Sequence, residues 1–405
     1  MSNVPMSNPE LMLACHEPFP LSRGACIQLK SGRVLACAGR GFGYSDDAGM
    51  TWCEPYEGRY PDGTATALQH LIELADGTIG GVERRLRPGS RIPSKNQLTF
   101  AISRDLGRTW SDPRPMTDEP LPGYMFQNAI LRLSSGRIVL PCYLGVTSLH
   151  ELSEIHTNTG GWADGQWVST EAHYYDPGFL SCYVLFSDDE GKTWQLNSSG
   201  QIHIFLPDGN FSPTAEPSVV EVQPGKLLMM MRTRLGRAFC SWSHDNGDTW
   251  TKPQPTHLAS SNSPVVIKKL PATGHLLCVW NQAGEEEIKQ GYIRSRLSAA
   301  VSRNGGAIWE FFQNVESLHE QRHVQSGPIR FTAPQGRHTY SPDQPALEND
   351  TRYTVELDPR YTRFTNHTVC VLEDRVLILY HGKCKVLPLN WFYRGRDPFA
   401  KHQRT

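Results

Sequence analysis

The sequence of 405 residues lacks several features that mark common classes of protein. No run of 18 apolar residues occurs, which excludes a transmembrane helix. No basic stretch followed by an apolar core precedes Cys15, so we expect no secretory signal peptide. The 40 basic and 41 acidic residues leave a formal net charge of -1. This balance argues against a protein that bulk charge holds on nucleic acid or on a membrane surface.

The ten cysteines include no C-x-x-C pair, so they fit neither a zinc site nor a dense disulfide framework. We therefore expect reduced, buried thiols in a cytoplasmic protein that binds no metal and needs no cofactor. Turn-forming residues and tryptophan, in contrast, are abundant: the chain has 35 Gly, 29 Pro and ten Trp. Such a chain turns often, and internal repeats can make one domain out of its whole length.

One octapeptide, S-x-D-x-G-x-T-W, recurs along the chain. Its Asp can accept hydrogen bonds from backbone N–H groups across a turn, its Gly supplies a positive φ, and its Trp can bury a ring between neighbouring units. The Asp position is occupied in the five copies by Asp47, Asp105, Asp189, Asp245 and, in a degraded copy, Asn304. These positions lie 58, 84, 56 and 59 residues apart, so the period is near 58 with one insertion.

A second repeat lies between these copies and consists of two short apolar runs joined by a turn. The turn residues are Gly32, Gly77, Gly136, Gly225, Gly274 and, in the sixth copy, Arg375. Runs of Val, Ile and Leu closed by turn residues predict buried strands. Six such hairpins, each followed by a strand, a turn and a further strand, predict an all-β, six-bladed β-propeller of four-stranded antiparallel blades.

We expect this propeller to occupy residues 18–390. A segment of residues 1–17 is a candidate for blade closure, and residues 391–405 are expected to form a tail. Two insertions, at about 144–179 and 311–363, carry aromatic and histidine residues. Such loops suit stacking on sugar rings, but they equally suit a cap over the mouth or packing against a partner subunit. The oligomeric state therefore stays open.

The hairpin register predicts where functional residues gather. In an antiparallel blade, the start of the first strand and the end of the second strand share one face. The first-strand starts are Arg23, Leu68, Gln127, Glu216 and Asn366, with Asn262 near the fifth. The second-strand ends are Gly39 with Arg40 beside it, Arg84, Tyr143, Arg232 and Asn281. This polar set is expected to meet at one mouth on the axis, with Glu216 beside Arg232, while the octapeptide turns lie on the other face.

The octapeptide is the Asp box, and repeated Asp boxes on six blades resemble the sialidase (neuraminidase) superfamily over nearly the whole chain. The segment AEPSVVEVQPGKLLMMMRTRLG resembles the blade that carries a Glu and an arginine in that family. The resemblance implies that Glu216 polarises the nucleophile and that Arg23, Arg232 and Arg294 bind a carboxylate. Three guanidinium groups aimed at one point select an acidic sugar.

The resemblance also implies a tyrosine nucleophile at the start of the last inner strand. This sequence has Thr365, Asn366 and His367 there, and Tyr361 lies just upstream, with Tyr340 further back. No Asp stands in the loop after the first hairpin, where the family places its acid/base residue.

Three functions are consistent with these residues. The first is an exo-acting glycosidase that releases a terminal acidic sugar, with Glu216 and Tyr361 in catalysis and Arg23, Arg84, Gln127, Arg232, Arg294 and Asn366 in substrate binding. The second is a uronate lyase or atypical hydrolase in which His367 is the general base. The third is a carbohydrate-binding propeller without turnover.

Overall fold

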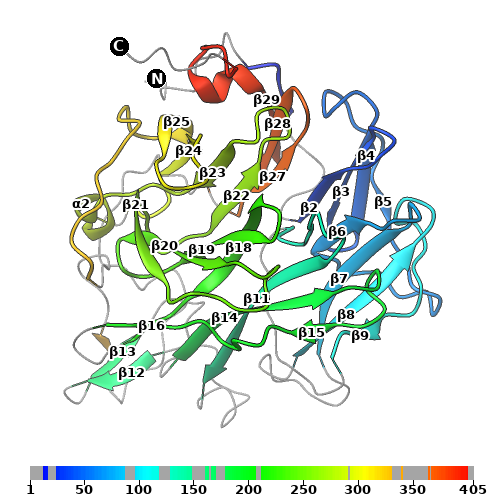
Figure 1. Cartoon of the computed structure of the whole chain (residues 1–405), viewed down its shortest axis with the longest axis horizontal. Coiled ribbons are helices and arrows are strands. Elements are labelled where there is room, and N and C mark those ends of the chain that lie inside the picture. Colours follow the sequence, from blue (N-terminus) through cyan, green and yellow to red (C-terminus); the bar gives the residue numbers. More distant parts are fainter. Residues whose placement is uncertain are drawn as a thin grey trace.

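A computed structural model of the protein describes residues 12–16, 24–86, 96–117, 128–147, 160–163, 166–169, 178–206, 211–290, 292–330, 339–340, 364 and 366–399. The strands form six four-stranded antiparallel sheets that follow one another around a common centre in chain order (Figure 1). The innermost strand of the first sheet contacts those of the second and sixth sheets, so the ring is closed. The predicted six-bladed β-propeller is confirmed.

The blades are built from strands that lie next to one another in the chain. Blade one holds β2 (Ala25–Gln28), β3 (Val34–Ala38), β4 (Gly41–Ser45) and β5 (Tyr56–Glu57), and blade two holds β6 (His70–Glu73), β7 (Ile79–Leu86), β8 (Asn96–Ser103) and β9 (Arg114–Pro115). Blade three holds β10 (Leu131–Arg132), β11 (Ile138–Thr147), β14 (Gly178–Ser187) and β15 (Gln195–Leu196). Blade four holds β18 (Ala215–Gln223), β19 (Lys226–Arg232), β20 (Arg237–Ser243) and β21 (Gln254–Ala259). Blade five holds β22 (Val265–Lys269), β23 (Leu276–Trp280), β24 (Arg296–Ser302) and β25 (Glu310–Ser317).

The sixth blade joins the two ends of the described chain. It holds β27 (Thr368–Val371), β28 (Arg375–Tyr380) and β29 (Lys383–Pro388), and β1 (Ala14–His16) pairs with β29 as its outer strand. A 3₁₀ helix, η4 (Leu389–Tyr393), follows β29. Trp391 and Phe392 in this helix are buried in the apolar core with residues of blades five and six. These aromatic rings thus add to the core just beyond residue 390, where the propeller was expected to end.

The Asp boxes join the third and fourth strands of five blades, and the second copy illustrates their structure. Asp105 accepts hydrogen bonds from the backbone N–H of Thr109 at 2.9 Å and from its hydroxyl at 2.6 Å. The hydroxyl of Ser103 accepts the N–H of Gly107 at 2.9 Å. Gly107 has a φ of 86°, and a Cβ there would lie 2.6 Å from the ring of Phe42 on the preceding blade. Asp47, Asp189, Asp245 and Asn304 accept the corresponding backbone N–H in the other copies.

Asp-box tryptophans also pack across the blade boundaries. The ring of Trp110 lies 5.9 Å from that of Phe42 on blade one, and the ring of Trp194 lies 5.5 Å from that of Phe100 on blade two. These contacts bear out the predicted packing of the tryptophan ring between units, and they make the turn part of the inter-blade core.

The described ends of the two expected insertions continue the strands of the blades. Strands β11 and β14 extend to Thr147 and back to Gly178, and β25 includes residues 311–317, so these parts belong to blades three and five. Within the insertions, β12 (Gly160–Ala163), β13 (Gln166–Ser169) and β26 (Thr339–Tyr340) form a small sheet in which β13 pairs with β26. The two insertions therefore meet. A separate ribbon, β16 (Ile204–Phe205) and β17 (Phe211–Ser212), precedes blade four, and a short helix, α2 (Glu285–Lys289), lies between β23 and β24.

Candidate functional site

Glu216 and Arg232 lie side by side at the start of β18 and the end of β19. One guanidinium nitrogen of Arg232 donates to Oε2 of Glu216 at 2.7 Å, and both side chains are mostly buried. The ladder pairs Ala215, rather than Glu216, with Arg232 and is interrupted before Ser218. Glu216 has a φ of 48°, which a residue with a side chain seldom adopts. A bulge thus turns the carboxylate toward the arginine, a use of bulges that is common next to functional sites.

Asn262, which precedes β22, connects this pair to Arg294. Nε of Arg232 donates to the side-chain oxygen of Asn262 at 2.8 Å. Arg294 donates to the backbone carbonyl of the same asparagine at 3.4 Å. One residue of blade five therefore holds two guanidinium groups that come from different blades. We call Glu216, Arg232, Asn262 and Arg294 the arginine cluster.

The backbone of Arg294 is tied to the segment before blade six. The backbone N–H of Phe364 donates to the carbonyl of Arg294 at 2.8 Å. The side-chain amide of Asn281 donates to the carbonyl of Phe364 and, at 3.0 Å, to that of Arg296. The side-chain oxygen of Asn281 is buried and meets no hydrogen-bond donor among the described residues. Asn281 therefore fixes the backbone on both sides of this contact, and with it the position of the Arg294 Cα from which the side chain extends.

His367 is enclosed by the protein rather than exposed to solvent. It is 0% exposed, and its Nε2 is 2.8 Å from the carbonyl of Val279, to which it donates. Burial, together with the nearby charge of Arg294, lowers the pKa of His367 to about 4, against the opposing effect of the hydrogen bond to the carbonyl of Val279. The neutral, enclosed imidazole bonds the start of blade six to β23 of blade five.

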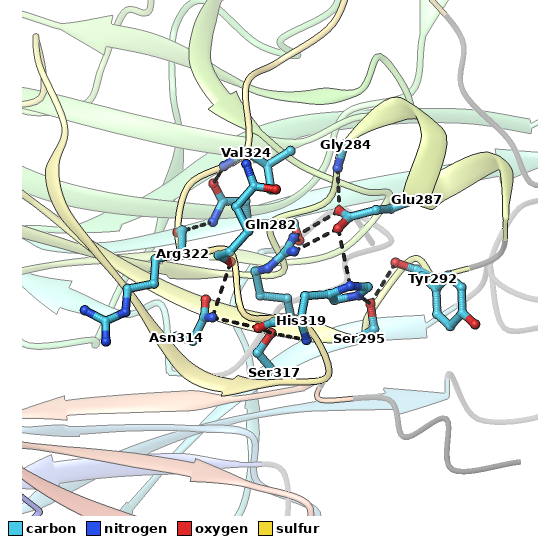
Figure 2. Close-up of polar contacts among 12 residues, drawn as sticks. Gln282, Gly284, Glu287, Tyr292, Ser295, Asn314, Ser317, His319, Arg322 and Val324 are labelled. Carbon is cyan, nitrogen blue, oxygen red and sulfur yellow. Dashed lines mark hydrogen bonds and ion pairs between the residues drawn. The ribbon is translucent and has the colours of Figure 1, made fainter. Parts of the chain in front are cut away.

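A polar network supports the start of β24, immediately after Arg294 (Figure 2). The guanidinium of Arg296 is 1% exposed and makes a bidentate pair with Glu287 of α2, at 2.8 and 2.9 Å. His319 lies 3.6 Å from Glu287 through Nδ1, and its Nε2 is 2.7 Å from the hydroxyl of Ser295. Ser295 is 2% exposed, so this row of Glu, His and Ser holds the chain and offers no accessible nucleophile.

The electrostatics of this network follow from its burial. Burial raises the pKa of Glu287, but the hydrogen bonds and charge of Arg296 outweigh it and hold that pKa below its ordinary value. Burial also lowers the pKa of His319, despite the opposing charge of Glu287. The network therefore contains a charged Glu–Arg pair beside a neutral histidine, which gives the backbone next to Arg294 a rigid support.

Comparison with known proteins identifies the family. A family model described as a BNR repeat-like domain matches residues 88–342, which is more than half of the chain. The chain belongs to the BNR repeat-like domain family. The resemblance of this BNR-repeat protein to the sialidase superfamily is likewise confirmed.

Individual relatives are distant. A sialidase from Bacteroides fragilis (strain YCH46) is 26% identical over 178 residues, which are 44% of this chain and 26% of that protein. The BNR-repeat protein thus spans about a quarter of the length of this relative. Among solved structures, the Hadza microbial sialidase Hz136 is 17% identical with a TM-score of 0.55, over 95% of this chain and 67% of its own. A protein of unknown function from Dyadobacter fermentans DSM 18053 is 16% identical with a TM-score of 0.54, over 93% and 98%. The alpha-L-arabinanase of Penicillium chrysogenum is 12% identical with a TM-score of 0.51, over 92% and 94%.

These structural neighbours share the fold of the BNR-repeat protein. Sialidases and an arabinanase both use it, so it is a fold of glycoside hydrolases whose likeness alone does not select one sugar.

Several residues predicted from the sequence remain predictions. Arg23, Gln127 and Tyr361 lie outside the described residues. Asn366 directly precedes the buried His367 and has a φ of 55°. In the described ranges, no group of three or more His, Cys, Asp or Glu side chains is placed to hold a metal ion. No helix in the described part of the chain is long and apolar enough to cross a membrane.

On blade two, the structure brings forward residues that the sequence did not single out. Arg84 of β7 pairs with Leu98 of β8, and its side chain is exposed. Its neighbour Glu83 is buried, accepts the N–H of Ala67 at 2.7 Å and pairs with Arg85. Since side chains alternate along a strand, residues 83 and 85 occupy the face opposite residue 84. The alternation of side chains along β7 is the sequence signal that places Glu83 and Arg85 together on one face.

Proposed function

We propose that the BNR-repeat protein is an exo-acting glycoside hydrolase that removes a terminal acidic sugar, such as sialic acid or a uronic acid. The observation that carries this proposal is the arginine cluster. Arg232 and Arg294 come from neighbouring blades, and one asparagine holds both. Guanidinium groups pair with a carboxylate in a planar, two-bonded geometry, and such groups are most effective when they are positioned before the ligand arrives.

Glu216 is the proposed proton acceptor of this site. Its bulged backbone and its contact with Arg232 fix the carboxylate at the end of β18. In the sialidase-type reaction a tyrosine hydroxyl gives its proton to this carboxylate and becomes the nucleophile, and Tyr361 is the residue that we propose for this step. Arg23, Arg84, Gln127 and Asn366 are proposed as further substrate contacts. A uronate lyase with His367 as base is not proposed, because this imidazole is enclosed.

The direct test is the release of sialic acid from a fluorogenic sialoside. We expect Glu216→Gln to lower kcat by about 10²–10⁴, the contribution typical of a positioned proton acceptor. Arg294→Ala is expected to raise KM, because it removes a carboxylate contact. Tyr361→Phe is expected to abolish release while the sugar still binds.

Arg33→Gln is the matched control, because Arg33 pairs with the exposed Asp46 beside a hairpin turn, on the face opposite the mouth. If Glu216→Gln releases sialic acid as fast as the wild type does, Glu216 is not the proton acceptor. Stoichiometric binding of sialic acid by the wild type without any release would identify a binding propeller instead.

A further inference from the structure

A groove lies on the outer rim of the propeller, between blades three and four. Residues 201–206, with Ser199, form one wall and residues 250–255 form the other, with Phe239 on β20 and Ile329 completing it. Its volume is about 530 Å³, within the range of pockets that bind small ligands. β16 and the edge strand β21 flank it, away from β18 and β22, which surround the axis (Figure 1). We call this feature the rim groove.

The floor of the rim groove is apolar and its edge is aromatic. Ile202, Ile204 and Phe239 are buried beneath it. Phe205 is 73% exposed, the largest exposure among the large apolar side chains of the described residues. The ring of His203 lies 5.9 Å from that of Phe205. Covering an apolar surface of this kind with a ligand is favourable in free energy because it removes the surface from water, and the C–H faces of sugar rings are suitable partners.

The polar side chains of the rim groove are mostly neutral. Gln201, Gln254, Thr251 and Ser199 bring amide and hydroxyl groups to it. Such groups both donate and accept hydrogen bonds, as the hydroxyls of a sugar require. Among the described residues of the lining, Lys252 is the one with a permanently charged side chain, and none of them is a carboxylate or an arginine. This chemistry suits a neutral sugar and differs from that of the arginine cluster.

The edge strand β21 opposes binding of a peptide as an added strand. Strand addition requires backbone N–H groups on the exposed edge. Pro253 and Pro255, which line the rim groove, have none, and the ladder between β20 and β21 has a register shift after Arg237. Recognition at this edge therefore depends on side chains.

We infer that the rim groove binds a neutral sugar unit of a glycan chain, at a site separate from the mouth. Phe205 covers the C–H face of the sugar ring, and the amides of Gln201 and Gln254 contact its hydroxyls. When the chain that carries the substrate also reaches this groove, the second contact raises the local concentration of substrate at the mouth.

Three neutral disaccharides, lactose, cellobiose and maltose, serve as probes in saturation-transfer NMR and isothermal titration calorimetry. We expect at least one to bind with a Kd on the order of 1 mM, the weak affinity of a shallow site. Phe205→Ala removes an exposed ring, so the variant folds, and we expect it to weaken binding about tenfold or more. Ile308→Ala is the matched control, because Ile308 is 60% exposed in the fifth Asp box, and binding should be unchanged.

Glu216→Gln separates this inference from the proposed function. It should lower the release of sialic acid by about 10²–10⁴ and leave disaccharide binding intact. The inference is overturned if none of the three disaccharides binds, if Phe205→Ala binds as the wild type does, or if Glu216→Gln abolishes binding and so places the sugar in the mouth. A change in sedimentation of Phe205→Ala from dimer to monomer would also overturn it, because the groove would then be a contact between two copies of the chain.

Discussion

The burial of His367 predicts a specific dependence of stability on pH. Its Nε2 donates to the carbonyl of Val279, and burial lowers its pKa to about 4. The ordinary pKa of histidine is about 6.5. Below that pH His367 is protonated in the unfolded chain but stays neutral in the folded protein until the pH approaches about 4. The stability that the neutral ring contributes is therefore complete above pH ~6.5 and falls as the pH decreases toward about 4.

The magnitude follows from the interval between the two pKa values. At pH ~5 the unfolded histidine has been protonated over about 1.5 pH units, which corresponds to about 2 kcal/mol at about 1.4 kcal/mol per unit. His70 adds a similar loss, because burial lowers its pKa to about 3. The wild type should therefore lose about 4 kcal/mol between pH ~7.5 and pH ~5 from these two residues.

Two substitutions assign the loss to each ring. His367→Gln keeps an N–H for the carbonyl of Val279 but cannot titrate, so it should lose only about 2 kcal/mol over the same interval. His70→Asn is the parallel variant, because its side-chain oxygen replaces the Nδ1 that accepts the N–H of Ala129 at 3.0 Å. Urea unfolding followed by tryptophan fluorescence at the two pH values measures both.

Parallel decreases in the wild type and His367→Gln would refute this reasoning, because they would mean that His367 titrates alike in the folded and unfolded chains. An accessible base in the mouth would behave in that way. The same variant should then also lose its activity, whereas an enclosed structural ring replaced by Gln should leave turnover close to that of the wild type.

Two further substitutions test the packing between blades and the buried ion pair. Gly107→Ala should destabilise more than Gly136→Ala, because both have a strongly positive φ but only the Cβ at Gly107 meets the ring of Phe42. Gly136→Ala should lower the free energy of unfolding by about 1–2 kcal/mol, which is the penalty of the left-handed conformation alone. Equal unfolding midpoints for the two variants would contradict the contact between position 107 and Phe42. Glu287→Gln leaves the buried charge of Arg296 uncompensated and should cost about 3–5 kcal/mol in urea unfolding, whereas adding Arg296→Met should restore much of it. A loss below about 1 kcal/mol would mean that solvent already screens the pair.

Local chemistry explains why the blades were predictable. In an Asp box, the bonds that shape the turn run between Ser103, Asp105, Gly107 and Thr109, all within six positions of one another. The same holds for the hairpin turns, where glycines supply positive φ values at the expected positions. Because the turns repeat, the number and order of the blades followed from the sequence.

The site was less predictable because it depends on departures from regular strands. A bulge at Glu216 shifts the ladder by one residue, so counting from the turn paired the wrong positions although the two side chains still meet. On β7, counting selected Arg84, which stays a proposed substrate contact, but it did not show the buried pair of Glu83 and Arg85 on the opposite face. Trp391 entered the core after the last strand, where no repeat marked it. Each difference comes from one residue of register or from packing between distant segments.

Positioning, more than the number of charges, distinguishes the arginine cluster from a set of surface ion pairs. Asn262 accepts hydrogen bonds from both Arg232 and Arg294. The carbonyl of Arg294 accepts the N–H of Phe364, and the carbonyl of Phe364 accepts a hydrogen bond from Asn281. The next residues of the chain are anchored by α2 through Glu287 and by the loop that carries His319. Guanidinium groups fixed in this way lose little side-chain freedom when a carboxylate binds, since the protein has already ordered them during folding. We therefore propose that the polar network around Arg296 supports the carboxylate binding proposed for the arginine cluster, although none of its side chains needs to touch the sugar.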